Sequence, residues 1–170
     1  MITGTVTSVF GDDINTDDII PALFLQRSTD RLFFKDYAFD KFDPEFRKRC
    51  KQTSTNIVVA GKNFGCGSSR EQAVYAIKDN DVVCVIAPSY PDIFYRNSLS
   101  NGLILITMPD TSTFQLGDKL QVDLNAGTIT NMTKNTTIAF EMNPDDKVTF
   151  QQGGMIGRVR QHLDEILQTA

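Results

Sequence analysis

The sequence predicts an α/β fold in which a parallel strand–helix–strand–helix–strand core stands beside an antiparallel region. Two observations predict it. Short apolar runs alternate with helical segments in the middle of the chain, and the last third changes to short strand-like segments separated by turn residues. Short connections between such strands and helices are typical of parallel units. Because 170 residues suit one domain with its own core, we expect a single domain over residues 1–170.

The N-terminal third contributes one clear strand. Residues 3–10 alternate apolar and polar side chains, which predicts a strand, and residues 11–18 form a polar turn. Pro21 prevents a further strand directly afterwards. Residues 23–54 are irregular, charged and rich in aromatic side chains, and we expect Pro44 to open a short helix there. The aromatic side chains favour a local core or a partner-facing cover over a cofactor site.

The parallel core is predicted between residues 56 and 107. Apolar runs predict strands at residues 56–60, 82–87 and 103–107. Helices are expected from Ser68 to about Asp79 and from Pro91 to about Ser100, the second ended by Asn101-Gly102.

The last third is predicted as an antiparallel meander followed by a helix. Strands are expected at residues 119–124, 128–131 and 137–142, joined by short polar turns. Apolar residues then recur at helical spacing, which predicts a C-terminal amphipathic helix. They are Met155, Ile156, Val159, Leu163, Ile166 and Leu167.

Composition excludes several functions. The net charge of −4 argues against a nucleic-acid-binding protein, which usually carries a basic face. The longest apolar run, residues 82–87, is far shorter than the roughly 20 residues that span a bilayer. The N-terminus lacks the basic start and apolar stretch of a signal peptide. We therefore expect a cytoplasmic protein with no membrane or nucleic-acid partner.

Few residues are available for metal or acid–base chemistry. Cys50, Cys66 and Cys84 are widely spaced, which predicts neither a disulfide framework nor a metal site. His162 is the only histidine, which excludes sites built on several histidines. Any catalytic groups of this chain must therefore be Ser, Arg, Asp or Cys, or a second chain must bring the rest.

The best candidate for chemistry is the Gly-rich segment 65–71. Ser68 and Glu71 have the spacing of a helix capping box, and that interpretation predicts a cost of about 1 kcal/mol for Ser68→Ala. A Gly-rich loop at a helix start also leaves N–H groups that bind a carboxylate or phosphate and stabilise a serine alkoxide. Arg70 is poorly placed for the helix dipole, which suggests a bidentate clamp on a carboxylate.

Two neighbouring signals are weaker. Cys66 lies near the same helix start, where the pKa of a thiol falls, but no histidine accompanies it as a base. Asp13, Asn15 and Asp17 resemble the start of a calcium loop without its later ligands. That segment is either an Asx-rich turn or a place from which Asp17 orients a catalytic group.

Three ordered motifs together resemble one family. They are Gly11–Ala22 (GDDINTDDIIPA), Gly61–Glu71 (GKNFGCGSSRE) and Ala87–Ser98 (APSYPDIFYRNS). The chain resembles the small subunits of 3-isopropylmalate dehydratases, the detached swivel domains of the aconitase superfamily. The resemblance covers nearly the whole chain and implies a three-layer β/β/α swivel domain.

The resemblance also implies a partner and a reaction. A large subunit carries a [4Fe-4S] cluster held by three cysteines, and the small subunit closes over it without binding a cofactor itself. The enzyme moves a hydroxyl group between adjacent carbons of a 2- or 3-hydroxy dicarboxylate, 2- or 3-isopropylmalate, by removing and re-adding water in leucine biosynthesis.

Site residues carry over from the resemblance one by one. Ser68 matches the family's base, which takes a proton from a substrate carbon. Ser69 and Arg70 match ligands of the substrate carboxylate. Thr16 and Asp17 match the family's Thr-Asp pair, in which the aspartate orients an acid of the large subunit and the threonine belongs to the substrate site.

The loop that reads the substrate side chain corresponds to Phe24, Leu25, Gln26 and Arg27. Arg27 leaves substrate choice open, because a basic residue also suits the extra carboxylate of homoaconitase substrates, and a methylmalate-type substrate fits as well. Gln72 stands where the family usually has histidine. A non-catalytic alternative is an anion-binding or regulatory module of the same fold.

Overall fold

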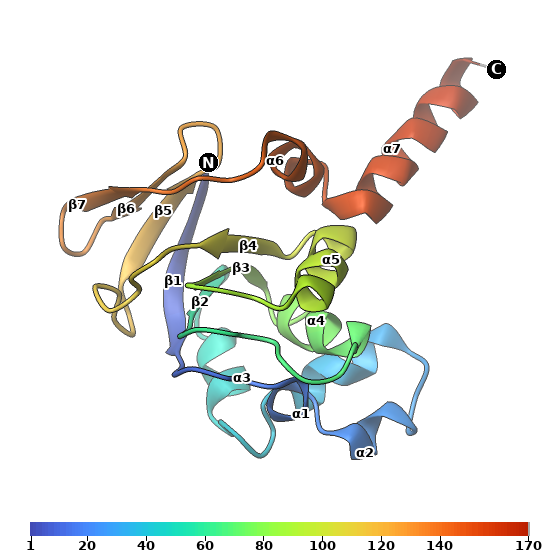
Figure 1. The fold of residues 1–170 in the computed structure, drawn as a ribbon. Coiled ribbons are helices and arrows are strands. Elements are labelled where there is room, and N and C mark those ends of the chain that lie inside the picture. The colour runs from blue at the N-terminus through green and yellow to red at the C-terminus, as the bar shows by residue number, and fades with distance from the viewer. Residues whose placement is uncertain (170) are drawn as a thin grey trace.

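A computed structural model describes residues 1–169 and contains one mixed seven-stranded sheet, in the order β4-β3-β2-β1-β5-β6-β7 (Figure 1). Strands β1 to β4 run parallel to one another, whereas β1–β5, β5–β6 and β6–β7 pair antiparallel. The strands are β1 (Ile2–Val9), β2 (Asn56–Val59), β3 (Val82–Ala87), β4 (Ile104–Thr107), β5 (Lys119–Asp123), β6 (Thr128–Asn131) and β7 (Thr136–Ala139). The predicted parallel core and antiparallel meander are confirmed.

Short helices fill the N-terminal third, and longer ones follow β2, β3 and β7. None of the helices in the described chain is long and apolar enough to cross a bilayer. The helices are α1 (Thr16–Ile19), α2 (Ala22–Leu25), the 3-10 helix η1 (Arg31–Tyr37), α3 (Phe46–Cys50), α4 (Glu71–Lys78), α5 (Asp92–Asn101), α6 (Pro144–Gln151) and α7 (Gly154–Thr169).

The parallel strands separate two apolar cores. Alternate side chains of a strand point to opposite faces. In β2, Val58 joins a core formed with the helices, whereas Ile57 and Val59 join a second core. That second core includes Leu120 and Ile129 of the antiparallel strands, which therefore fold over the other face (Figure 1). Helices, parallel strands and antiparallel strands stack in the predicted layer order.

The aromatic segment forms a local core. Phe39 and Phe46 are fully buried, and Phe39 stacks on Phe10 with ring centroids 4.7 Å apart. This core also supports α1, because the N–H of Phe39 donates to the carbonyl of Ile19 at 2.8 Å. The interpretation as local core is confirmed.

Some element boundaries were predicted wrongly. Two one-turn helices, α1 and α2, lie where a polar turn over residues 11–18 and an irregular segment from residue 23 were expected, and α6 was not predicted. The helix expected at Pro44 begins at Phe46. The helix expected at Ser68 begins at Glu71, because the preceding residues pair with a distant segment instead.

Candidate active site

Two segments far apart in sequence meet beyond the carboxyl ends of β1 and β2, where Val9 lies opposite Val59. The backbone N–H of Gly65 donates to the carbonyl of Ile14 at 2.7 Å. The N–H of Thr16 donates to the carbonyl of Cys66 at 2.8 Å. The carboxyl ends of parallel strands are the usual place for a ligand site in an α/β sheet.

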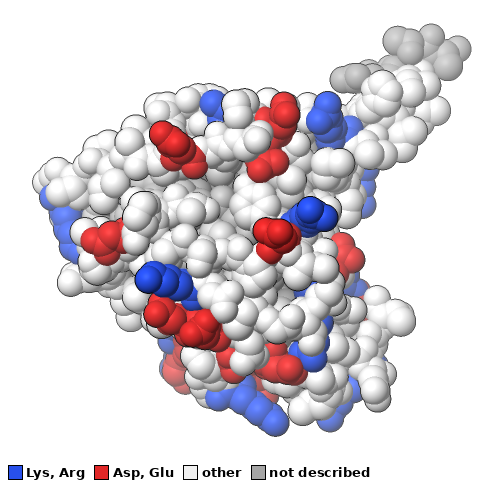
Figure 2. All heavy atoms as spheres, viewed as in Figure 1, with Lys and Arg blue, Asp and Glu red and all other residues white. Residues whose placement is uncertain are grey.

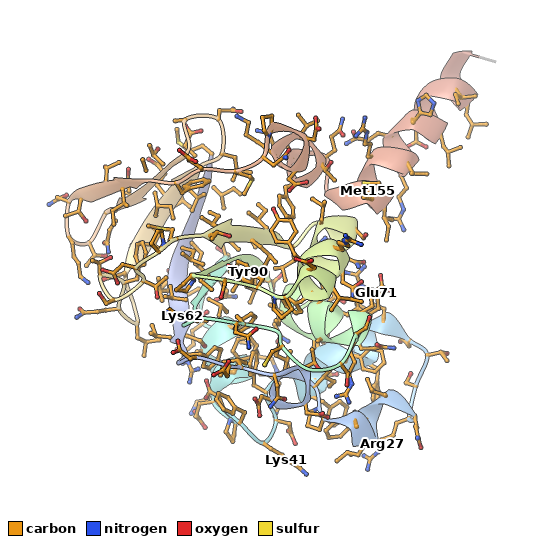
Figure 3. The ribbon with its side chains drawn as sticks, viewed as in Figure 1. Arg27, Lys41, Lys62, Glu71, Tyr90 and Met155 are labelled. Atoms are coloured by element: carbon orange, nitrogen blue, oxygen red, sulfur yellow. The ribbon has the colours of Figure 1, made fainter. Side chains whose placement is uncertain are left out.

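The third sequence motif supports the same edge from β3. Ser89 follows that strand, and its hydroxyl accepts from the N–H of Asn63 at 2.8 Å. Its carbonyl accepts from the N–H of Phe64 at 3.1 Å. All three motifs therefore converge on one loop, which starts near Lys62 and ends near Glu71 in Figure 3.

Thr16 fixes the position of Ser68. The Thr16 hydroxyl oxygen accepts from the backbone N–H of Ser68 at 3.1 Å, and Thr16 is only 1% exposed. Gly67 makes this approach possible, because its φ of +96° is a left-handed conformation and an added Cβ would come within 3.3 Å of the Thr16 hydroxyl.

An ion pair joins the same two segments a second time. Nη1 of Arg70 lies 2.5 Å from Oδ1 of Asp17 and 3.5 Å from the carbonyl of Ile20. The Asp17 carboxylate also accepts from the N–H of Ala22 at 3.1 Å. The Arg70 guanidinium lowers the pKa of Asp17, so that carboxyl is ionised at neutral pH.

The ion pair with Asp17 uses only part of the hydrogen-bonding capacity of the Arg70 side chain. It is 14% exposed, whereas the Asp17 side chain is 57% exposed. Every described contact of the guanidinium uses Nη1, and within residues 1–169 no partner binds Nε or Nη2. That edge is therefore available for the bidentate binding of a carboxylate.

Ser68 and Ser69 are both exposed on the surface. In the described chain, neither hydroxyl has a hydrogen-bond partner, and neither do the backbone N–H groups of Ser69 and Arg70. The predicted capping box of Ser68 and Glu71 is wrong, since the N-cap of α4 is Arg70 and makes no side-chain cap. Ser68 donates its N–H to the Thr16 hydroxyl, so that N–H is not free for the Glu71 carboxylate.

A capping box does exist, on the other side of the junction. Asn15 Oδ1 accepts from the N–H of Asp18 at 2.9 Å, and Asp18 Oδ2 accepts from the N–H of Asn15 at 2.9 Å. The same Asn-x-x-Asp spacing was visible in the sequence but read as an Asx-rich turn. It starts α1 and so places Thr16 and Asp17 on the first turn facing the loop.

The residues after Pro21 are arranged in two groups. Phe24 is 5% exposed and stacks on Tyr37 with ring centroids 4.1 Å apart, so it anchors the segment. Leu25 is half-buried, whereas Gln26 and Arg27 are exposed. Arg27 lies at the lower edge of the molecule (Figure 3). The Arg27 guanidinium lies 5.1 Å from the centroid of the Phe24 ring.

An open hollow of about 450 Å³ lies beside α1 and the start of α2. Asp17 and Pro21 line one part of it, and Lys41 and Phe42 line another. Figure 2 shows acidic and basic side chains interspersed over the face in view. No described contact joins Arg27 to Ser68, Ser69 or Arg70, so the structure brings Thr16, Asp17 and the serine loop together and leaves Arg27 apart.

The cysteines do not gather into a metal site. Cys50 and Cys84 are buried in different cores, and Cys66 is partly exposed in the loop. Among the side chains that the structure describes, no group of three or more His, Cys, Asp or Glu is placed to hold a metal. Burial raises the pKa of the Cys66 thiol, which opposes its use as a thiolate nucleophile.

Comparisons with known proteins agree with this geometry. Residues 2–111 match the family model of the aconitase C-terminal domain. The chain is 41% identical over 157 residues to the 3-isopropylmalate dehydratase small subunit of Methanosarcina mazei, covering 92% of this chain and 95% of the relative. The small subunit of Aliarcobacter butzleri is 38% identical over 167 residues, 98% of each chain. The crystal structure of a 3-isopropylmalate dehydratase from Methanocaldococcus jannaschii superposes with a TM-score of 0.86, at 36% identity over 99% of each chain.

The loop geometry makes a prediction about Gly65. Its φ is +83°, and an added Cβ would lie 2.3 Å from the nearest ring carbon of Phe94. We expect Gly65→Ala to lower the free energy of unfolding by about 3 kcal/mol, from left-handed strain and steric overlap together. Urea denaturation measures this. Gly117→Ala is the matched control, because its φ is +87° but nothing lies within 4 Å of its added Cβ, and we expect about 1 kcal/mol. Equal losses would show that the Phe94 contact is unimportant.

Proposed function

The chain belongs to the family of 3-isopropylmalate dehydratase small subunits, which carry the aconitase C-terminal domain, and we propose that its Ser68 loop is half of a hydro-lyase active site. One observation carries the proposal. Thr16 and Asp17 bind the loop through Ser68 and Arg70, so the residues expected to act together are held at one junction.

The first role is to bind a substrate carboxylate. The open edge of Arg70 and the unpaired N–H groups beside it offer several donors to one anion. Ser69 is exposed next to these donors and adds a hydroxyl. When a proton leaves the carbon next to a carboxylate, negative charge grows on that carboxylate. Donors placed there stabilise the transition state more than the ground state.

The second role is proton transfer. The Ser68 hydroxyl, as an alkoxide, takes the proton from the substrate carbon, and the C–H electron pair forms the new double bond. The hydroxyl group on the neighbouring carbon leaves with its own electron pair. Re-addition of water in the opposite sense moves the hydroxyl to the adjacent carbon. The free N–H groups of the loop and the nearby Arg70 cation favour the charged form of Ser68.

Thr16 and Asp17 support these groups from α1. Thr16 is buried, so we propose that it positions Ser68 through the backbone N–H rather than reaching far toward the substrate. Asp17 holds Arg70 with one oxygen and remains largely exposed. An ionised carboxylate in that place is suited to orient an acid supplied by another chain.

The partner in this proposal is a large subunit. The membership in a small-subunit family implies such a partner. We place a [4Fe-4S] cluster in the large subunit, because the cysteines of this chain lie in separate cores and do not fit one. Such a cluster supplies a Lewis acid for the departing hydroxyl. The three free thiols are typical of a reducing compartment, which supports a cytoplasmic location.

The substrate is proposed to be 2- or 3-isopropylmalate, read by the segment after Pro21. Phe24 is buried and fixes the segment, so Gln26 and Arg27 are the side chains presented outward. Arg27 is the one cation of this segment, and the alternatives are the extra carboxylate of a homoaconitase substrate or a methylmalate.

The direct test is an anaerobic dehydration assay with 3-isopropylmalate. The absorbance of the new double bond is followed with this chain alone, a family large subunit alone, and both together. We expect activity only in the mixture, because each chain carries half of the site. No activity in a complex with an intact cluster would contradict isopropylmalate as substrate, and full activity of the large subunit alone would contradict the shared site.

Ser68→Ala tests the base assignment in that mixture. We expect kcat/KM to fall about a thousandfold, as for the loss of a positioned general base. The Ser68 hydroxyl has no partner in the described chain, so the free energy of unfolding should change by less than about 0.5 kcal/mol. This replaces the larger cost that the capping box had predicted. Ser54→Ala, at an exposed serine before β2, is the control. Retained activity of Ser68→Ala would leave an anion-binding or regulatory role for the loop.

Arg27→Leu tests substrate choice. Loss of a charged donor should disfavour a substrate with an extra carboxylate, so we expect the kcat/KM ratio of isopropylmalate to homoaconitate to rise about tenfold. Arg27→Lys keeps the charge and should leave the ratio nearly unchanged. If Arg27→Leu leaves the ratio unchanged, Arg27 does not read the substrate.

A further inference from the structure

The carboxylate of Glu71 belongs to the first residue of α4, directly after the loop that is proposed to bind a substrate carboxylate. In the described chain, the N–H groups of Ser69 and Arg70 and one edge of the Arg70 guanidinium have no partner. Such donors bind a carboxylate of the protein as readily as one of a substrate. A site built in this way has to keep its own acid away from its donors.

Asn101, at the end of α5, holds the Glu71 carboxylate. Its Nδ2 donates to Oε1 of Glu71 at 2.8 Å and to the carbonyl of Asn97 at 2.9 Å. Both protons of the amide are used, and because both partners are acceptors they fix which way the amide is turned. Asn101 is 2% exposed, so water does not compete for its side of the bond.

The oxygen of the same amide points to a role beyond packing. Within the described residues, Oδ1 of Asn101 is buried and has no hydrogen-bond partner. A buried acceptor without a partner lowers stability, and a leucine of similar shape would not carry that cost. The one described bond that the amide makes outside α5 is the bond to Glu71.

Two neighbouring groups favour the same place for the Glu71 carboxylate. Tyr75 lies one turn further along α4, and burial and the Glu71 charge raise the pKa of Tyr75, so its hydroxyl stays protonated. The Arg31 guanidinium, paired with Asp79, lies 4.6 Å from the centroid of the Tyr75 ring. An amide, a hydroxyl and a cation therefore attract the carboxylate toward α5 and η1.

We propose that Asn101 is a positioning residue of the site, which keeps the Glu71 carboxylate off the donors that bind the substrate carboxylate. This role rests on the proposed function of the Ser68 loop. It is a second reason why the predicted capping box does not form. Glu71 has the sequence spacing to turn back toward Ser68, but its carboxylate is bound by Asn101 instead. The donors of the loop are thereby left open to an anion from solution.

Steady-state kinetics of the mixture with the large subunit test this role. Asn101→Leu removes the donor and nearly keeps the shape. We expect KM for 3-isopropylmalate to rise about tenfold, because the released carboxylate competes for the donors, and kcat to stay within about twofold. The double variant Asn101→Leu with Glu71→Gln should bring KM back to within about twofold of the wild type, because no charge remains to compete. A merely structural role would leave the double variant as impaired as the single one.

Two more variants separate positioning from folding. Ser98→Ala is the matched control and should leave KM unchanged, because Ser98 is fully buried on the same helix and its hydroxyl has no partner in the described chain. Glu71→Asp keeps the charge but draws it back from Asn101. It should raise KM as Asn101→Leu does, and it does so without altering α5. Circular dichroism checks that each variant is folded.

Amide NMR of the full chain alone adds a measurement that needs no turnover. Succinate is titrated as a plain dicarboxylate, and we expect the amide signals of Ser69 and Arg70 to shift. The succinate Kd should be at least about threefold higher for Asn101→Leu and should return in the double variant.

The outcomes separate this role from the proposed reaction. An unchanged KM in both Asn101→Leu and Glu71→Asp would overturn the role of Asn101 and leave the dehydratase function intact, and so would a double variant that stays impaired. A wild-type mixture inactive on 3-isopropylmalate, with the succinate pattern as expected, would contradict the reaction and support the positioning role. A wild-type chain that neither turns over substrate in the mixture nor binds succinate alone would overturn both.

Discussion

The contact between the α1 segment and the Ser68 loop is the constraint on which the rest of the site depends. The two segments lie more than 40 residues apart, and the parallel pairing of β1 with β2 brings their ends to one edge. Backbone bonds from Thr16 to Cys66 and from Gly65 to Ile14 then fix the loop before any side chain contributes. The Thr16 hydroxyl and the Asp17 carboxylate add two side-chain links, to Ser68 and Arg70. The pairing of the strands therefore fixes where the loop lies, and the side chains at the junction supply its polar groups.

This arrangement suits the proposed role of Ser68 as a base that has no histidine beside it. The loop leaves N–H groups unpaired and keeps Arg70 oriented by Asp17, so little side-chain freedom remains to be lost on binding. The same groups face solvent, and water weakens each of their interactions with charge. A second surface that excludes water would strengthen them, and in the proposed function the large subunit supplies that surface.

The sequence was most informative where neighbouring residues decide the structure. The apolar runs of β2, β3 and β4 and the Asn101-Gly102 helix end are local signals, and they were predicted within a residue or two. The spacing of Ser68 and Glu71 was also a local signal. The Ser68 N–H is bound instead by Thr16, which follows a different strand. Residue spacing within the loop cannot reveal a competing hydrogen-bond acceptor that comes from another segment. Conversely, the capping box that does form, between Asn15 and Asp18, has a local spacing in the sequence. The neighbouring acidic residues led to the prediction of a turn there instead.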